Sequence, residues 1–310
     1  MNHVVVTGGA GFIGSNLCRR LISNGDKVLV IDNLITSDGT HLKQFRNNPN
    51  FKFIKQDITT SHFALRNSKF EIIYHLACPT GVPNLTKLGE EMLRTCSIGT
   101  LSVLELARKN QAKLIFTSSS EIYGDPKEFP QMESYTGNVD PVGARSPYEE
   151  GKRFSESLII MYVRKFNLDA RIIRVFNTYG PGTSKNETRV VSRFLRNAKS
   201  NRPLPVEGNG KQTRTFCYVD DLIDALLLIA ERGKKGEIYN AGGDIEISIN
   251  ELAKLVLFVT GSKSKIKHIP RPGHDHQGRR PDLSKLKSLG WQQTVGIYEG
   301  LKLTIDPALS

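Results

Sequence analysis

Two short stretches of the sequence combine side chains that could move a proton on a bound ligand. The first holds the hydroxyls of Ser119 and Ser120 and the carboxylate of Glu121. The second holds Tyr148 and Lys152, whose spacing of four residues places both side chains on one face of a helix. Because an ammonium group beside a phenol favours the phenolate, we expect the pKa of Tyr148 to fall below its usual value of about 10. A phenol tuned in this way could act as a base near neutral pH.

The segments around these stretches are predicted to hold them at the edge of a sheet. An unbroken apolar run at 113–116 precedes the hydroxyls and is typical of a buried strand. The hydroxyls and Glu121 would then follow the C-terminal end of a strand, where open α/β sheets bind ligands. Pro147 suits the first turn of the helix that would carry Tyr148. A Tyr-x-x-x-Lys pair can also be an ordinary surface pair, so it does not define a function alone.

A glycine-rich turn near the N-terminus predicts a dinucleotide site. A strand signal at 3–7 runs directly into the turn, and helical spacing follows at 15–22. The glycines of the turn are Gly8, Gly11 and Gly14. Such a turn lets the backbone approach a pyrophosphate, which the helix N-terminus then binds. A second strand at 27–31 ends at Asp32, whose carboxylate would bind the ribose 2′-hydroxyl and repel a 2′-phosphate, which favours NAD over NADP. The alternative interpretation is a plain loop.

The order of the remaining segments predicts the fold class. Strand signals at 51–58 and 70–77 alternate with helical stretches, and a further helix is expected over 98–109. This alternation indicates an α/β protein with a Rossmann-type, doubly wound parallel sheet and a smaller C-terminal substrate-binding lobe. In that lobe Ser248 and Glu251 have the spacing of a helix capping box. The predicted division is an NAD-binding domain over 1–175 plus about 215–242, and a substrate lobe over about 176–214 and 243–310.

Composition narrows the class of protein. With 310 residues, 38% of them apolar and 24% charged, the chain resembles an ordinary soluble globular protein. We expect no membrane segment, since no apolar run approaches about 18 residues, and no signal peptide. The four cysteines have no metal-type spacing, which indicates reduced thiols, a cytoplasmic location and no metal site. The net charge of +12 could suit nucleic acid, but no recognition motif is present, and an anionic small substrate explains it equally well.

Taken together, these motifs resemble the extended short-chain dehydrogenase/reductase family. The matching residues are Gly8-x-x-Gly11-x-x-Gly14, Asp32, Asp57-Ile58, His75-Leu76-Ala77, Ser119, Tyr148-x-x-x-Lys152 and Asn177. The resemblance implies an NAD site formed by Gly8, Gly11, Phe12, Ile13, Gly14, Asp32, Asn33, Asp57, Ile58, Leu76, Ala77, Tyr148 and Lys152. It also implies a homodimer in which helices near 92–109 and 148–165 pair across a two-fold axis.

Within this family the chain is similar to the UDP-glucuronate decarboxylases, also called UDP-xylose synthases. The segments that carry this similarity are 118–126, 148–153, 176–181, 189–192, 212–216 and 280–282. The dTDP-glucose-type 4,6-dehydratases instead use a Thr-Asp-Glu run whose Asp protonates the leaving hydroxyl, and Ser120 stands at that position here. Three alternatives remain open: another NAD-dependent nucleotide-sugar 4,6-dehydratase, a 4-epimerase, or a non-enzymatic NAD-binding protein.

The similarity implies a role for each candidate residue. UDP-glucuronate would be oxidised at C4, lose carbon dioxide and be reduced to UDP-xylose, with NAD recycled. The implied catalytic residues are Ser119, Ser120, Glu121, Tyr148, Lys152 and Arg214. The implied substrate-binding residues are Asn177, Arg189, Val191, Gln212, Arg214 and Arg279, of which Asn177, Arg189 and Arg279 would bind the diphosphate. The structural alternatives are surface ion pairs for the arginines, and helix capping or pairing with Arg145 for Glu121.

Two single residues and one loop depart from the decarboxylase pattern. Gly182 stands where an arginine is usual, and Cys96 stands where an asparagine is usual. The loop at 78–85 reads Cys-Pro-Thr-Gly-Val-Pro-Asn-Leu instead of Ser-Pro-Ala-Ser-Pro-Pro-Asn-Tyr. Because that loop would border the sugar, the departures bear on which sugar is bound.

Overall fold

The central element is a parallel sheet, which the computed structural model describes within residues 1–60, 69–183, 187–270 and 278–305. In this part of the chain the sheet has seven strands in the order β11-β6-β5-β4-β1-β2-β3. They are β1 (His3–Thr7), β2 (Lys27–Asp32), β3 (Phe51–Lys55), β4 (Ile72–His75), β5 (Lys113–Ser119), β6 (Ala170–Val175) and β11 (Ile238–Ala241). The strand order reverses between β1 and β4, which creates a crevice at their carboxyl ends. The predicted fold class is confirmed.

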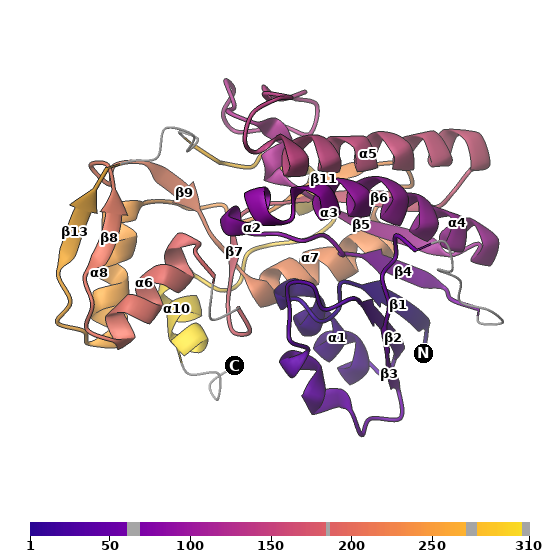
Figure 1. The fold of residues 1–310 in the computed structure, drawn as a ribbon, viewed down its shortest axis with the longest axis horizontal. Helices are drawn as coiled ribbons and strands as arrows, with labels where there is room; N and C mark the ends of the chain where they lie inside the picture. Colours follow the sequence, from indigo (N-terminus) through magenta and orange to yellow (C-terminus); the bar gives the residue numbers. More distant parts are fainter. Residues whose placement is uncertain (61–68, 184–186, 271–277, 306–310) are drawn as a thin grey trace.

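Helices cover both faces of this sheet (Figure 1). Helices α1 (Phe12–Ser23) and α7 (Val219–Arg232) pack on one face, and α4 (Thr100–Asn110) and α5 (Ser146–Phe166) pack on the other. In β1, Val4 and Val6 belong to the first core and Val5 to the second, and none is more than 1% exposed. Because both faces are buried, the strands read as unbroken apolar runs instead of alternating patterns.

A smaller group of elements from the C-terminal half of the chain lies to the left in Figure 1. They include α6 (Val190–Lys199), β8 (Leu204–Glu207), β9 (Thr213–Thr215), β12 (Glu246–Ser248), α8 (Ile249–Thr260), β13 (Ile266–Ile269) and α10 (Ile297–Ile305). The predicted capping box of α8 is confirmed, because the Ser248 hydroxyl accepts from the Glu251 amide at 3.1 Å and Glu251 accepts in return. The division into two domains stays a prediction, and its ranges include 61–68, 184–186, 271–277 and 306–310, which lie outside the described residues.

Several elements begin or end away from their predicted limits. Helix α1 begins at Phe12 instead of 15, because Gly14 lies in its first turn and weakens the helical signal. Strand β5 continues past 116 to Ser119, since its pairing with β6 extends to Ser119 opposite Val175. Helix α6 covers Val190–Lys199. In the described part of the chain, no helix is both long and apolar enough to cross a bilayer.

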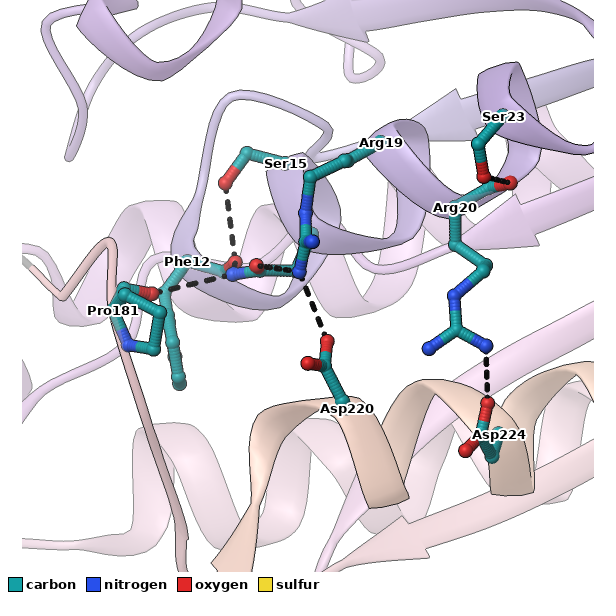
Figure 2. Close-up of polar contacts among 9 residues, drawn as sticks. Phe12, Ser15, Arg19, Arg20, Ser23, Pro181, Asp220 and Asp224 are labelled. Atoms are coloured by element: carbon teal, nitrogen blue, oxygen red, sulfur yellow. Dashed lines mark hydrogen bonds and ion pairs between the residues drawn. The ribbon is translucent and has the colours of Figure 1, made fainter. Parts of the chain in front are cut away.

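Polar contacts attach α1 to its neighbours (Figure 2). Two ion pairs join α1 to α7, and they are Arg19–Asp220 and Arg20–Asp224. Partly exposed pairs of this kind contribute about 0–1 kcal/mol each. In addition, the Asn16 side chain donates to the carbonyl of Phe12 at 2.9 Å and of Pro181 at 3.3 Å. The helix that follows the glycine turn is therefore attached to the loop after β7 (Thr178–Tyr179).

The three glycines of the turn have different surroundings. Gly8 has a φ of +74°, and a Cβ there would lie 2.6 Å from the Ala77 nitrogen. A Cβ on Gly14 would lie 2.3 Å from the Gly8 carbonyl oxygen, so this glycine allows the helix to pack against the strand. On Gly11, which has a φ of −76°, the nearest atom would be 3.4 Å away. Gly11 is therefore the least crowded of the three glycines.

We predict that Gly14→Ala destabilises the protein, whereas Gly11→Ala does not. The alanine methyl at 14 meets backbone atoms that cannot move aside, and overpacking of this kind costs about 1–3 kcal/mol or more. Thermal unfolding of the two variants and the wild type measures the difference. Equal melting temperatures for Gly14→Ala and the wild type would contradict the packing role assigned to Gly14.

Candidate active site

The strands point their carboxyl ends into one large cleft of about 1480 Å³. Every residue predicted from the sequence as catalytic, cofactor-binding or substrate-binding lines this cleft. Gly8 follows β1, Asp32 ends β2, Leu76 follows β4 and Ser119 ends β5. The structure therefore brings the candidates together, while their individual roles stay predictions.

Two carboxylates lie at the ends of neighbouring strands in the proposed cofactor part of the cleft. Asp32 accepts backbone N–H groups from Ala10 at 3.0 Å and Leu34 at 2.8 Å. Burial raises the pKa of Asp32 above its usual value, although these hydrogen bonds oppose the rise. Asp57 accepts from the Asn33 side chain at 2.9 Å. Both carboxylates are thus held in fixed positions by the protein itself.

The ammonium of Lys152 is enclosed at the base of the cleft. The side chain is 3% exposed, and its Nζ donates to the Thr117 carbonyl at 2.8 Å. It also lies 4.7 Å from the centre of the Phe116 ring, a favourable position for a cation. Thr117 and Phe116 belong to β5, the strand that ends at Ser119. Lys152 therefore connects the helix bearing Tyr148 to the strand bearing the hydroxyl.

The environment of Tyr148 differs from the sequence-based expectation. Loss of water around the phenol raises the pKa of Tyr148 to about 12, although the charge of Lys152 and a hydrogen bond with Ser119 lower it. The prediction of a pKa below 10 is therefore wrong. The ammonium acts in the expected direction, but desolvation of the phenolate is the larger effect. For Lys152, burial alone would lower the pKa, yet the surrounding Cys78, Cys96 and Tyr148 raise it, so the side chain stays charged.

The hydroxyl of Ser119 is fixed by local geometry. Ser119 caps the short turn Ser120–Tyr123, and its Oγ accepts from the Glu121 amide at 3.2 Å. The same oxygen is within hydrogen-bonding reach of Tyr148. Ser119 thus lies between the turn and the phenol.

Two arginines hold the carboxylate of Glu121. Arg145 pairs with Glu121 and also with Glu149, at 3.1 Å in the second case. Arg279 lies 3.2 Å from Glu121, donates to the Ser120 carbonyl and is only 5% exposed. The pairing with Arg145 considered as a structural alternative is therefore present. Because Glu121 also lines the cleft, pairing and a catalytic role are compatible.

The candidates on the substrate side are held less tightly. Arg189 precedes the first turn of α6, its side chain is 45% exposed, and it pairs with Glu187 at 2.5 Å. Gln212 donates to the Glu207 carbonyl at 2.7 Å, and Arg214 donates to the Thr213 carbonyl at 2.8 Å. The others, Asn177 and Val191, lie after β6 and in the first turn of α6. Arg279 lies with the catalytic group around Glu121, so a role at the diphosphate stays a prediction without support from this geometry.

The sequence interpretation missed some residues of the cleft wall. Arg193 lines the cleft and pairs with Glu207 at 2.9 Å. It follows Arg189 by four residues on α6, and this helical spacing could have identified it. Arg145 was considered only as a partner for Glu121, and Cys78 only as a departure, yet both line the cleft.

Comparisons with known proteins agree with this geometry. UDP-glucuronic acid decarboxylase 4 of Arabidopsis thaliana is 42% identical over 304 residues, 98% of this chain and 68% of that protein. The crystal structure of a Thermotoga maritima UDP-glucose 4-epimerase with UDP-glucose matches with a TM-score of 0.89 and 31% identity, covering 99% of this chain and 100% of that one. A dTDP-glucose 4,6-dehydratase from Streptomyces venezuelae, with NAD bound, matches with a TM-score of 0.88 and 27% identity, covering 98% and 95%. The model of the NAD dependent epimerase/dehydratase family matches residues 4–242, and the chain belongs to that family.

Proposed function

We propose that the protein decarboxylates UDP-glucuronate to UDP-xylose through a 4-keto intermediate. The observation that carries this proposal is the group formed by Ser119, Tyr148 and Lys152 beside a carboxylate, Glu121, that two arginines hold in the same cleft. The similarity to a UDP-glucuronic acid decarboxylase over nearly the whole chain supports the choice of reaction.

The residues of the glycine turn fit the NAD that the reaction needs. Gly11 has no side chain to hinder the approach of a pyrophosphate to the backbone, and the first turn of α1 follows it directly. Asp32 provides a fixed carboxylate at the end of β2 for a ribose hydroxyl. When bound, oxidised NAD supplies a hydride acceptor and a positive charge that would lower the pKa of a nearby phenol.

Tyr148 and Lys152 would carry out proton transfer at the C4 hydroxyl of the sugar. Tyr148 would accept the proton of the C4 hydroxyl as this carbon is oxidised, and would return it when the carbon is reduced. Because the phenol is desolvated, forming its phenolate costs free energy, and the charge of Lys152 lowers this cost. Lys152 keeps this position through the Thr117 carbonyl and the Phe116 ring.

The other residues would act on the decarboxylation. A C4 ketone is β to the C6 carboxylate, so the electrons of the breaking C5–C6 bond pass into the ketone as carbon dioxide leaves. Ser119 and Tyr148 would donate hydrogen bonds to the developing oxyanion. Glu121 would orient the sugar or relay a proton, and Arg214 would bind the substrate or help to protonate C5. We further propose that Arg279, beside Glu121, attracts the sugar carboxylate into this part of the cleft.

The second candidate is another nucleotide-sugar enzyme of the same family. The solved structures of a 4-epimerase and a 4,6-dehydratase share the fold, so the overall architecture does not separate these reactions. The residue between Ser119 and Glu121 favours decarboxylation over dehydration, because Ser120 offers no carboxylic acid to protonate a leaving hydroxyl. The intact Ser119, Tyr148 and Lys152 disfavour a role limited to binding NAD.

We predict that the purified protein converts UDP-glucuronate to a product lighter by one carbon dioxide, and that Tyr148→Phe slows this conversion by roughly 10²–10⁴-fold. Mass spectrometry of the nucleotide sugars over time measures both. UDP-glucose in place of UDP-glucuronate provides the control for general sugar turnover. If folded protein with NAD bound leaves UDP-glucuronate unchanged after long incubation, the decarboxylase assignment is rejected.

We also propose a homodimer. The helices α3 (Gly89–Arg94), α4 and α5 lie on one side of the sheet (Figure 1) and expose large apolar side chains. These are Leu93, Leu101, Phe154 and Met161, together with Ile98 in the turn between α3 and α4, and each is at least 40% exposed. Apolar side chains gathered on neighbouring helices favour burial against a second copy related by a two-fold axis. A cytoplasmic location is also proposed, with support from the four free thiols.

We predict that Phe154→Asp weakens or abolishes the dimer, because a carboxylate would be buried in an apolar interface. Light scattering after gel filtration, compared with the 34.6 kDa chain mass, measures the oligomer. The matched control is Phe258→Asp, which changes an even more exposed aromatic residue on α8, at 73% against 53% for Phe154, and should leave the mass unchanged. A wild-type protein that runs as a monomer at all concentrations would disprove the dimer.

A further inference from the structure

Two cysteines lie next to each other in the wall of the cleft. The sulfur atoms of Cys78 and Cys96 are 3.7 Å apart, although the residues are 18 positions apart in sequence. Cys78 belongs to the loop after β4 and lines the cleft, whereas Cys96 is 2% exposed in the π-helical turn Thr95–Gly99 before α4. Both are free thiols. The fold thus places the two sulfurs side by side, and one of them belongs to a residue that lines the cleft.

The pair lies against the catalytic helix. A Cβ built on Gly151 would be 3.2 Å from the Cβ of Cys96 and 3.3 Å from its sulfur, so the glycine leaves the space that Cys96 occupies. Gly151 lies on α5 between Tyr148 and Lys152. The Ser155 hydroxyl, one turn further along α5, donates to the Cys96 carbonyl at 2.7 Å. A chemical change at the sulfurs would therefore alter the packing of α5 next to Tyr148, the proposed base.

The charges around the pair favour a reactive thiolate. A hydrogen bond from Cys78 and the charge of Lys152 lower the pKa of Cys96 to about 7, although burial opposes the change. The same hydrogen bond raises the pKa of Cys78, so the two thiols share one proton. Thiolates, and not thiols, are the nucleophiles in oxidation. The pair therefore forms a thiolate more readily than an isolated buried cysteine would.

We propose that Cys78 and Cys96 form a reversible disulfide, a redox modification site in the wall of the cleft for which a hydroperoxide is the oxidant. A disulfide requires sulfur atoms about 2.05 Å apart. The present separation of 3.7 Å must therefore shorten. Residues 76–80, which include Cys78, form no helix or strand and can absorb this shift. This inference concerns regulation of the active site and so rests on the proposed function.

The oxidation balances with one equivalent of hydroperoxide. The thiolate of the pair, carried by Cys78 at the cleft after the shared proton moves to Cys96, attacks one peroxide oxygen. The O–O bond breaks, hydroxide leaves and takes up a proton, and Cys78 becomes a sulfenic acid. Cys96 then attacks this sulfur, the S–O bond breaks and water leaves. In total two thiols lose two electrons and two protons, and one hydrogen peroxide becomes two waters. A dithiol reductant reverses the reaction by exchange.

The new bond would close a covalent loop around one wall of the cleft. That loop contains α2 (Val82–Lys87) and α3, whose residues Glu91 and Arg94 line the cleft. Cys78 also directly follows Ala77, a predicted cofactor residue. Closing the bond therefore fixes this wall against α5 and displaces the chain beside Ala77. We expect kcat/KM to fall several-fold in the oxidised protein.

The first test treats the full-length protein with hydrogen peroxide and maps disulfide-linked peptides by mass spectrometry. A Cys78–Cys96 crosslink is expected in the wild type, with the loss of two of the four titratable thiols. The buried thiols of Cys18 and Cys217 supply matched controls, since Cys18→Ser and Cys217→Ser should still form the crosslink. Cys78→Ser and Cys96→Ser should not. No crosslink in the wild type, or thiol loss without preference among the four cysteines, would overturn the proposal.

The second test compares kcat/KM of the oxidised and the reduced form for each variant. The kcat/KM of the wild type should fall on oxidation and recover with dithiothreitol, whereas the ratio of oxidised to reduced kcat/KM should stay near one in Cys78→Ser, which lacks the sulfur that attacks the peroxide. An unchanged ratio in a wild type with a mapped crosslink would overturn the regulatory effect. Peptide mapping needs no substrate, so it tests the disulfide even if the protein does not decarboxylate UDP-glucuronate. The two proposals can thus fail separately.

Discussion

The buried ammonium of Lys152 is the constraint on which the site depends. Placing a charge at 3% exposure costs several kcal/mol unless nearby groups compensate. Here β5 supplies a carbonyl from Thr117 and an aromatic face from Phe116. The same strand ends in Ser119, and the helix that carries Lys152 also carries Tyr148. Compensating the charge therefore aligns the strand, the helix and the three proposed catalytic groups with one another.

A second constraint lies on the other side of Ser119. Glu121 is held by Arg145 and Arg279, which come from distant parts of the chain. Groups fixed in this way need not reorganise when charge develops in a transition state, and this is the main source of electrostatic catalysis. For a substrate that itself carries a carboxylate, an enclosed arginine offers both attraction and desolvation.

The sequence was sufficient for those features that depend on local pattern. Unbroken apolar runs identified strands buried on both faces, and the spacing of Gly8, Gly11 and Gly14 identified the dinucleotide turn. The spacing of Tyr148 and Lys152 placed both on one helix that lines the cleft. Each of these inferences uses residues separated by only a few positions, where backbone geometry determines the neighbours.

Features that depend on burial or on distant contacts could not be predicted. Loss of water around Tyr148 reversed the expected pKa shift, because desolvation is a property of the folded surroundings. Arg279 reaches the Ser120 carbonyl across 159 residues, which no local pattern indicates. The same holds for the sulfurs of Cys78 and Cys96, which the sequence showed only as two separate departures.

The most direct test is the pH dependence of the first chemical step in the wild type and in Lys152→Met. A single turnover with UDP-glucuronate can be followed through the absorbance of reduced nicotinamide as pH is varied. If the charge of Lys152 lowers the free energy of the Tyr148 phenolate, removing that charge raises the pKa of the phenol further. The midpoint of the increase in rate with pH should then lie at least about one pH unit higher in Lys152→Met. The same midpoint in both proteins would show that Lys152 does not tune Tyr148.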